Sequence, residues 1–344
     1  MPPDALRSSV EFDPARLDSF LRASIPGLSG EMRIERVGGG QSNPTFFVSY
    51  DERCLVLRKK PPGEVLPSAH AVDREFRILT ALADTDVPVP KTLLFHADRD
   101  IVGTPFYVME RIEGRVFHDA ALPGVAPEDR RPMYLSMAET MAHLHAVDWA
   151  AIGLGDYGKP GNYFVRQIAR WTRQWELSRT RDIPEIDMIS AWLQSNLPSD
   201  DETTICHGDF RIGNMMFHST EPRVVAVLDW ELSTLGHPLA DAAFSCLVWH
   251  SRPEWYGGLF GLDLPSLGIP TQEEYLDRYY AVSGRSTRVE LFHLVFSLFR
   301  FAVILEGIAA RARAGNAAAE NAAKVGELSI AYARRAADLI KTSA

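Results

Sequence analysis

The sequence is poor in cysteine and has no cysteine motif for binding zinc. Its 344 residues contain only three cysteines, Cys54, Cys206 and Cys246. They are too few and too widely spaced for a disulfide framework or a paired zinc site. Each lies in an apolar stretch, so we expect three buried thiols in a protein from a reducing compartment.

Long apolar segments and an excess of basic residues are also missing. The most apolar segment, 291–305, is interrupted by His293 and Arg300 and is too short to span a bilayer, so it predicts a core helix. The first ten residues lack the basic start and apolar stretch of a secretion signal. The formal net charge of -9 disfavours a nucleic-acid partner. We therefore expect a cytoplasmic protein that binds neither nucleic acid nor membrane, with its oligomeric state left open.

Hydrophobic periodicity divides the chain into a strand-rich part and a helical part. In the first part we expect a mostly antiparallel sheet with helices at 14–24 and 69–83, and strands at 34–37, 45–50, 54–60, 91–97 and 106–111. In the second part we expect helices at 126–147, 186–196, 238–249, 272–283, 288–314 and 319–341, and an undefined polar stretch at 162–181. The sequence therefore predicts an α+β fold with an N-terminal lobe of residues 1–110 and a mainly helical C-terminal lobe of residues 111–344.

The strongest chemical signal is the segment His207-Gly208-Asp209-Phe210-Arg211-Ile212-Gly213-Asn214, followed fifteen residues later by Asp229. Strand patterns at 203–206, 215–218 and 224–228 flank the loop. A protein-kinase catalytic loop reads H-R-D-x-x-x-x-N, where Asp accepts the proton of the attacking hydroxyl, and Asn and a later Asp hold magnesium. The spacing thus predicts Asp209 as the base and Asn214 and Asp229 as metal ligands. We expect His207 to brace the loop and Arg211 to contact phosphate or substrate.

A second group of residues in the N-terminal lobe is suited to binding a nucleotide. Glycines let a backbone approach phosphates and offer N–H donors, so Gly39 and Gly40, with the side chains of Ser42 and Asn43, are candidates. On the strand at 54–60 we expect Arg58 to contact the phosphates, with Lys59 and Lys60 as alternatives, and Glu75 to pair with that cation. Met109, Glu110 and Ile112 are candidates for the adenine pocket. An ordinary turn, edge charges and an edge strand remain the simpler alternatives.

Together these motifs resemble the aminoglycoside phosphotransferase family, which is similar in fold to protein kinases and choline kinases. The resemblance is most specific in H-G-D-F-x-x-x-N, in V-L-D-W-E at 227–231, and at 236–241, where His237 replaces the first Asp of the family's G-D-P-x-x-D and Asp241 matches the second, which braces the catalytic loop. Residues 57–75 look similar to kinase-like domains associated with acyl-CoA dehydrogenases. The resemblance implies a protein-kinase-like bilobal fold, ATP as donor and Mg²⁺ as cofactor.

The sequence therefore predicts an ATP-dependent phosphotransferase that moves the γ-phosphate to a hydroxyl of a small molecule. The similarity of residues 57–75 suggests an acceptor of the hydroxyacyl type. One alternative is an aminoglycoside or other antibiotic phosphotransferase, whose cationic substrate would need acids such as Asp182, Glu185 and Asp187. Another is a nucleotide-binding pseudokinase without catalysis. The aromatic residues that could line an acceptor groove, or simply pack between helices, are Tyr163, Trp171, Trp175, Trp249, Trp255 and Tyr256. The acceptor and the choice between ATP and GTP stay open.

Overall fold

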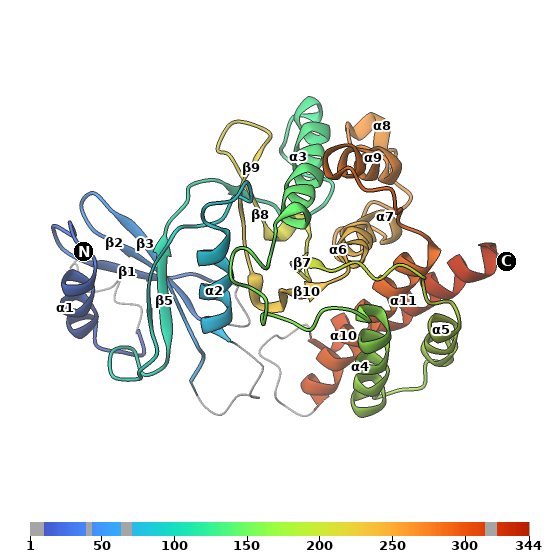
Figure 1. Cartoon of the computed structure of the whole chain (residues 1–344), viewed down its shortest axis with the longest axis horizontal. Coiled ribbons are helices and arrows are strands. Elements are labelled where there is room, and N and C mark those ends of the chain that lie inside the picture. The colour runs from blue at the N-terminus through green and yellow to red at the C-terminus, as the bar shows by residue number, and fades with distance from the viewer. Residues whose placement is uncertain (1–9, 39–42, 63–70, 314–321, 344) are drawn as a thin grey trace. The chain divides into compact units, whose positions relative to one another are not determined.

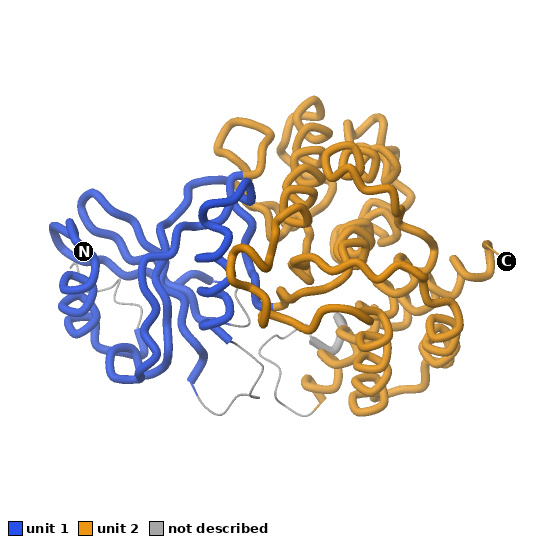
Figure 2. Tube along the Cα trace, in the orientation of Figure 1, with its two compact units in different colours: residues 1–114, 225–231 blue, residues 115–224, 232–344 orange. Residues whose placement is uncertain are grey.

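The computed structural model describes residues 10–38, 43–62, 71–313 and 322–343. Contacts along the chain divide it into two compact units (Figure 2). Unit 1 comprises residues 1–114 and 225–231, and unit 2 comprises residues 115–224 and 232–344. The boundary expected at residue 110 leaves out the short second segment of unit 1. That segment is held there by a hydrogen bond of 2.8 Å from the Val227 N–H to the Pro88 carbonyl.

Unit 1 contains a five-stranded antiparallel sheet with strand order β1-β2-β3-β5-β4. The strands are β1 (Arg33–Arg36), β2 (Thr45–Ser49), β3 (Cys54–Lys59), β4 (Thr92–His96) and β5 (Phe106–Glu110). All five were expected from the period-two pattern of the sequence, within one or two residues at each end. In the β3–β5 pair Arg58 lies opposite Tyr107, which fixes the register that the sequence left open.

The two helices of unit 1, α1 (Pro14–Ser24) and α2 (Val72–Leu82), cover opposite faces of this sheet (Figure 1). Leu17 and Leu21 of α1 are fully buried in a core that includes Leu57 and Val108. Burial of such side chains contributes about 1.5–3 kcal/mol each. Because side chains alternate along a strand, residue 58, next to Leu57, points to the α2 face.

Unit 2 is mainly helical (Figure 1). Its helices are α3 (Pro127–Ala146), α4 (Tyr163–Ser178), α5 (Pro184–Ser195), α6 (Pro238–Ser245), α7 (Leu247–His250), α8 (Leu264–Leu267), α9 (Gln272–Ser283), α10 (Leu291–Arg313) and α11 (Ala322–Ser343). Side chains of α4, α5, α6, α10 and α11 form one hydrophobic core. The sequence missed α4. It predicted α6 and α7 as one helix, although the helix is interrupted at Cys246.

Helix α10 has 23 residues, so it is longer than the apolar segment in the sequence and, by length and composition, could cross a membrane. However, 72% of its most apolar window is buried inside the protein. Its apolar surface is therefore used within unit 2, as the prediction of a core helix requires.

Short strands frame the loop between residues 206 and 215. β7 (Thr204–Cys206) pairs with β10 (Thr234–Gly236), and β8 (Met215–Phe217) pairs with β6 (Arg115–Val116). β9 (Val224–Val227) follows β8, and its last three residues belong to unit 1. The predicted sequence of strand, loop and two further strands is thus confirmed.

The predicted burial of the cysteines is correct for two of the three. Cys206 and Cys246 are buried, whereas Cys54 is exposed. Cys54 is the first residue of β3 and lies opposite Ser49, the last residue of β2. At the end of a hairpin the apolar neighbours in the sequence do not cover the side chain.

Candidate active-site residues

The loop that follows β7 fixes the carboxylate of Asp209. The amide nitrogen of Asn214 donates to both the carbonyl oxygen and Oδ2 of Asp209, each at 2.8 Å. Arg211 Nε lies 3.2 Å from the same Oδ2. These contacts hold the carboxylate in one orientation and leave the amide oxygen of Asn214 available to a metal ion.

The backbone of this loop requires glycine at position 208. Gly208 has a φ of +84°, and a Cβ there would lie 2.6 Å from the Leu232 carbonyl oxygen. The neighbouring His207 is fully buried, and its Nδ1 accepts the N–H of Asp209 at 3.2 Å. His207 therefore supports the loop backbone, and its ring is not exposed for proton exchange with solvent.

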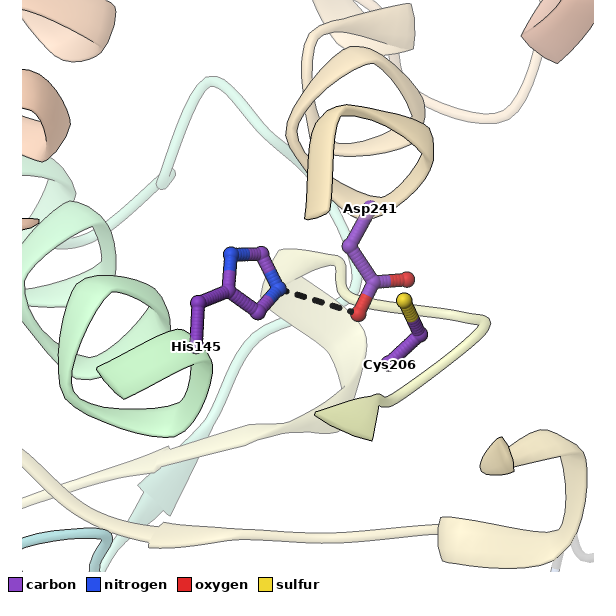
Figure 3. A group of neighbouring side chains, drawn as sticks. All are labelled: His145, Cys206 and Asp241. Atoms are coloured by element: carbon purple, nitrogen blue, oxygen red, sulfur yellow. Dashed lines mark ion pairs between the residues drawn. The ribbon is translucent and has the colours of Figure 1, made fainter. Parts of the chain in front are cut away.

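Asp241, in the first turn of α6, holds the backbone at the start of the loop. Its carboxylate accepts the N–H of His207 at 2.5 Å and the N–H of Gly208 at 2.8 Å. His145 Nε2, from the end of α3, lies 3.6 Å away, as the dashed line in Figure 3 shows. Burial alone would raise the pKa of Asp241, but His145 and the Gly208 N–H outweigh it and lower that pKa. The anchor is therefore an ionised carboxylate.

Cys206 completes the group in Figure 3, but it does not make the group a metal site. Its thiol donates to the His237 carbonyl at 3.3 Å, and burial raises its pKa well above the usual value. Zinc ligation requires a thiolate, and the oxygens of Asp241 already bind the loop. The three residues form a structural brace.

His237 replaces the family's first Asp, and the structure shows what it does there. Its Nδ1 accepts the N–H of Leu239 at 3.2 Å, which caps α6, and its Nε2 lies 3.0 Å from Asp200. A neutral imidazole can thus supply the capping acceptor that an Asp side chain offers.

Unit 1 contains a buried ionic cluster on the α2 face of its sheet. Arg58 Nε lies 3.0 Å from Glu75 Oε2, and Arg58 Nη2 donates to Asp229 Oδ1 at 2.7 Å. Glu75 is only 1% exposed and also accepts hydrogen bonds from Asn43 and Tyr107 at 2.7 and 2.9 Å. Burial alone would lower the pKa of Arg58, but the charges of Glu75 and Asp229 raise it above its usual range. The guanidinium is therefore a permanent cation.

Asp229 stands out by its backbone as well. It is one of four non-glycine residues in the described chain with a positive φ, here 64°. Such conformations cluster at functional sites, although Asp tolerates them better than most residues. Oxygens of Asp229, Glu75 and Glu231 lie within 4.8 Å of one another. This set of hard oxygen donors fits Mg²⁺.

The other nucleotide-site candidates fall into three groups. Gly39, Gly40 and Ser42 lie outside the described residues. The sequence led us to expect that Asn43 would donate to a phosphate. Asn43 is buried, and its amide nitrogen donates to Glu75. Of the alternatives to Arg58, Lys59 points to the other face and donates to the Val102 carbonyl at 2.8 Å.

The candidates for the adenine pocket lie at the end of β5. Met109 is buried, and the N–H of Glu110 bonds to the Lys91 carbonyl. The N–H of Ile112 has no hydrogen-bond partner within the described residues. The role of these residues in an adenine pocket stays a prediction.

Unit 2 contains a cavity of about 210 Å³ that reaches Asp209. Its wall is mostly apolar, and its polar members include His118, Arg211, Ser251 and Arg300. Asp209 is its only carboxylate among the described residues. The apolar lining consists chiefly of Ile212, Leu232, Phe244, Leu247, Val248, Trp255, Phe301, Ile304, Leu305 and Ile308.

Of the aromatic candidates for an acceptor groove, Trp255 and Tyr256 line this cavity. Tyr163, Trp175 and Trp249 are buried elsewhere in unit 2, where they serve packing. The sequence missed His118, Arg300 and Tyr332 as cavity residues and His145 as part of the brace. No local motif marks them, because they come from elements far from the catalytic loop in sequence.

The known proteins similar to this chain agree with the geometry. A model of the phosphotransferase enzyme family (APH) matches residues 33–276. The chain belongs to this family. The finding confirms the family that the sequence motifs resemble.

A solved structure of a Ralstonia eutropha protein, named as an aminoglycoside phosphotransferase, matches the chain with a TM-score of 0.88 and 44% identity, over 96% of this chain and 99% of that one. Choline kinase from Cryptosporidium parvum matches with a TM-score of 0.66 and 14% identity, over 96% and 97% of the two chains, which shows the fold alone. The chain thus has the predicted protein-kinase-like α+β fold.

Two multidomain relatives are similar over nearly the whole chain. Acyl-CoA dehydrogenase family member 10 from Mus musculus is 41% identical over 97% of this chain. Family member 11 from Homo sapiens is 40% identical over 90% of it. The chain spans only 32% and 41% of the lengths of these two relatives.

Proposed function

We propose that the protein is an ATP-dependent phosphotransferase of the cytoplasm that transfers the γ-phosphate to a hydroxyl on an apolar small molecule of the hydroxyacyl type. The observation that carries this proposal is the position of Asp209 in the wall of an apolar cavity. A hydroxyl that enters this cavity meets a carboxylate whose orientation is fixed by Asn214 and Arg211.

In the reaction, Asp209 accepts the proton of the acceptor hydroxyl while the hydroxyl oxygen bonds to the γ-phosphorus. The bond from that phosphorus to the β–γ bridging oxygen breaks, and ADP leaves with the electron pair. Catalysis of phosphoryl transfer consists mostly of positioning and charge stabilisation. The brace formed by Asp241 and His145 serves positioning, since it holds the backbone of residues 207 and 208.

The ionic cluster of unit 1 suits the nucleotide. Arg58 would contact the phosphates, and Glu75 would hold the guanidinium in place. Mg²⁺ would offset the charge of the phosphates, and the sequence predicts Asp229 and Asn214 as the residues that hold it. Because Arg58 donates to Asp229, we expect bound phosphates to compete with Asp229 for this guanidinium.

The composition of the cavity favours an apolar acceptor over an aminoglycoside. A polycationic drug needs several carboxylates, but Asp209 is the only one in the described cavity wall, and it already faces Arg211. Two of the three acids expected to serve such a drug have other partners, since Asp187 accepts the indole N–H of Trp175 and Glu185 pairs with Arg334. The third, Asp182, does not line the cavity. Acids in the first turn of α5 also complement its dipole.

The kinship with acyl-CoA dehydrogenase family members 10 and 11 supports an acyl-type acceptor. A pseudokinase is disfavoured because Asp209, Asn214 and Asp229 are all present. The test is transfer from γ-labelled ATP to a panel of medium-chain hydroxy acids, their thioesters and aminoglycosides, with Mg²⁺.

We expect Asp209→Asn to lower turnover by about 10²–10⁴-fold, the usual contribution of a general base, while ATP affinity changes little. Asp182→Asn is the matched control, because Asp182 is exposed and does not line the cavity. Unchanged turnover in Asp209→Asn would refute the assigned base. Phosphate transfer to aminoglycosides alone would refute the proposed acceptor.

A further inference from the structure

One cation of the cavity has no carboxylate within ion-pairing distance in the part of the chain that the structure describes. Arg300, in the middle of α10, is only 6% exposed and lines the cavity beside Asp209. Its guanidinium packs near two aromatic rings, 5.6 Å from the ring centre of Trp171 and 5.1 Å from that of Phe244. Its Nη2 donates to the Gly208 carbonyl at 2.5 Å.

Two other arginines with largely covered side chains show how the protein compensates such a charge. Arg58 has Glu75 and Asp229, and Arg285 has Glu202 as an ion-pair partner. For Arg300, no carboxylate of the described residues lies within ion-pairing distance, and its one hydrogen bond is to a neutral carbonyl. An unpaired charge inside an apolar wall is costly, which calls for an anion from outside the chain.

We propose that Arg300 binds a carboxylate of the acceptor and so selects hydroxy acids over neutral alcohols. This inference rests on the proposed function, since it names the group that the acceptor carries besides its hydroxyl. The carboxylate would take the guanidinium N–H groups that face the cavity, while Nη2 keeps the Gly208 carbonyl. One side chain thus connects the bound anion with the residue that precedes Asp209.

The first test measures binding and needs no turnover. Octanoate and its primary amide, octanamide, have the same length and apolar body but differ in charge, and the fluorescence of Trp255 in the cavity wall can follow their binding. A charge-assisted hydrogen bond is about twice as strong as a neutral one, so we expect octanoate to bind about tenfold more tightly. In Arg300→Gln this preference disappears, because glutamine can still donate to Gly208 but has no charge.

Two further variants distinguish recognition of the ligand's negative charge from a merely structural role of Arg300. Arg300→Lys keeps the charge and retains part of the preference. Arg311→Gln removes an exposed arginine from the same helix and leaves the preference unchanged. Equal binding of octanoate and octanamide by the wild-type protein, or a preference that survives in folded Arg300→Gln, overturns the proposal.

The second test uses a hydroxy acid and its amide as acceptors with γ-labelled ATP. In Arg300→Gln we expect kcat/KM to fall about tenfold or more for the acid, chiefly through KM, and little for the amide. An equal loss for both would show that Arg300 only holds the loop. If neither compound is phosphorylated but octanoate still binds through Arg300, the proposed function fails and the anion site stands.

Discussion

The buried cluster around Arg58 gives a sharp test of the energetics in unit 1. Glu75 is 1% exposed and is the partner of three groups, the Arg58 guanidinium, the Asn43 amide and the Tyr107 hydroxyl. Glu75→Ala leaves all three without this acceptor. Removal of one member of a buried ion pair typically costs 3–5 kcal/mol, so we expect unfolding to become easier by about that amount.

A double-mutant cycle separates the ion pair from the rest of the cluster. Arg58→Met leaves the Glu75 carboxylate buried without its cation, whereas Glu75→Gln keeps a hydrogen-bond acceptor for Asn43 and Tyr107. The double variant contains no unpaired charge at these two positions, so its loss of stability should be smaller than the sum of the single losses by about 2 kcal/mol or more. Residues in contact commonly couple by 0.5–3 kcal/mol.

The measurement is urea unfolding of the full chain, with ATP affinity as a second readout. Arg36→Met is the matched control, because the Arg36–Glu11 pair of the same unit is exposed and spans 3.5 Å. Exposed pairs contribute about 0–1 kcal/mol. Additive losses at Arg58 and Glu75, or losses no larger than that of the control, would refute the reasoning that burial makes this cluster strong.

Two further predictions concern the loop and acid stability. Gly208→Ala should lower the free energy of unfolding by about 1–2 kcal/mol for its left-handed φ alone. It should also lower turnover, because the new Cβ would lie 2.6 Å from a carbonyl oxygen. Gly155→Ala is the control, since its Cβ meets no atom within 4 Å, and similar turnover in both variants would contradict this prediction. Burial lowers the pKa of His250 and His293 from 6.5 to about 4. The unfolded chain therefore binds more protons between these values, so stability is fully present above pH 6.5 and falls as the pH drops toward 4, by up to about 1.4 kcal/mol per pH unit for each histidine. Urea midpoints that coincide at pH 7 and pH 5 would exclude it.

Local signals explain which helices could be predicted from the sequence. The helix at 272–283 begins after Thr271, which forms a capping box with Glu274, and ends at Gly284 in the left-handed conformation. Both signals lie within a few residues of the helix ends. The helix α4 has no side-chain cap. Its sequence is rich in arginine and tryptophan, and it is only partly buried. Its buried residues Tyr163, Phe164, Ile168 and Trp175 nevertheless recur at helical spacing, so the helical period was present in a stretch that its polar residues led us to leave undefined.

The catalytic loop was recognisable for a similar reason, since Asp209, Arg211 and Asn214 are close in sequence and in space. The sequence could not decide between Arg58 and Lys59, because a shift by one residue exchanges the two faces of a strand. The pairing of Arg58 with Tyr107 across the sheet places Arg58 on the α2 face beside Glu75, while its contact with phosphates stays a prediction. That information is a contact between residues 49 positions apart, and no local pattern contains it.

The role of Arg300 is indicated by contacts that are distant in sequence. In the sequence its charge only interrupts an apolar segment and argues against a membrane span. In the structure α10 is a core helix, and this charge faces a cavity beside the catalytic loop, 92 residues away from its hydrogen-bond partner Gly208. A core helix gains nothing in packing from an unpaired guanidinium that leucine or methionine could replace. The presence of arginine at this position is therefore better explained by a bound anion than by the stability of the fold.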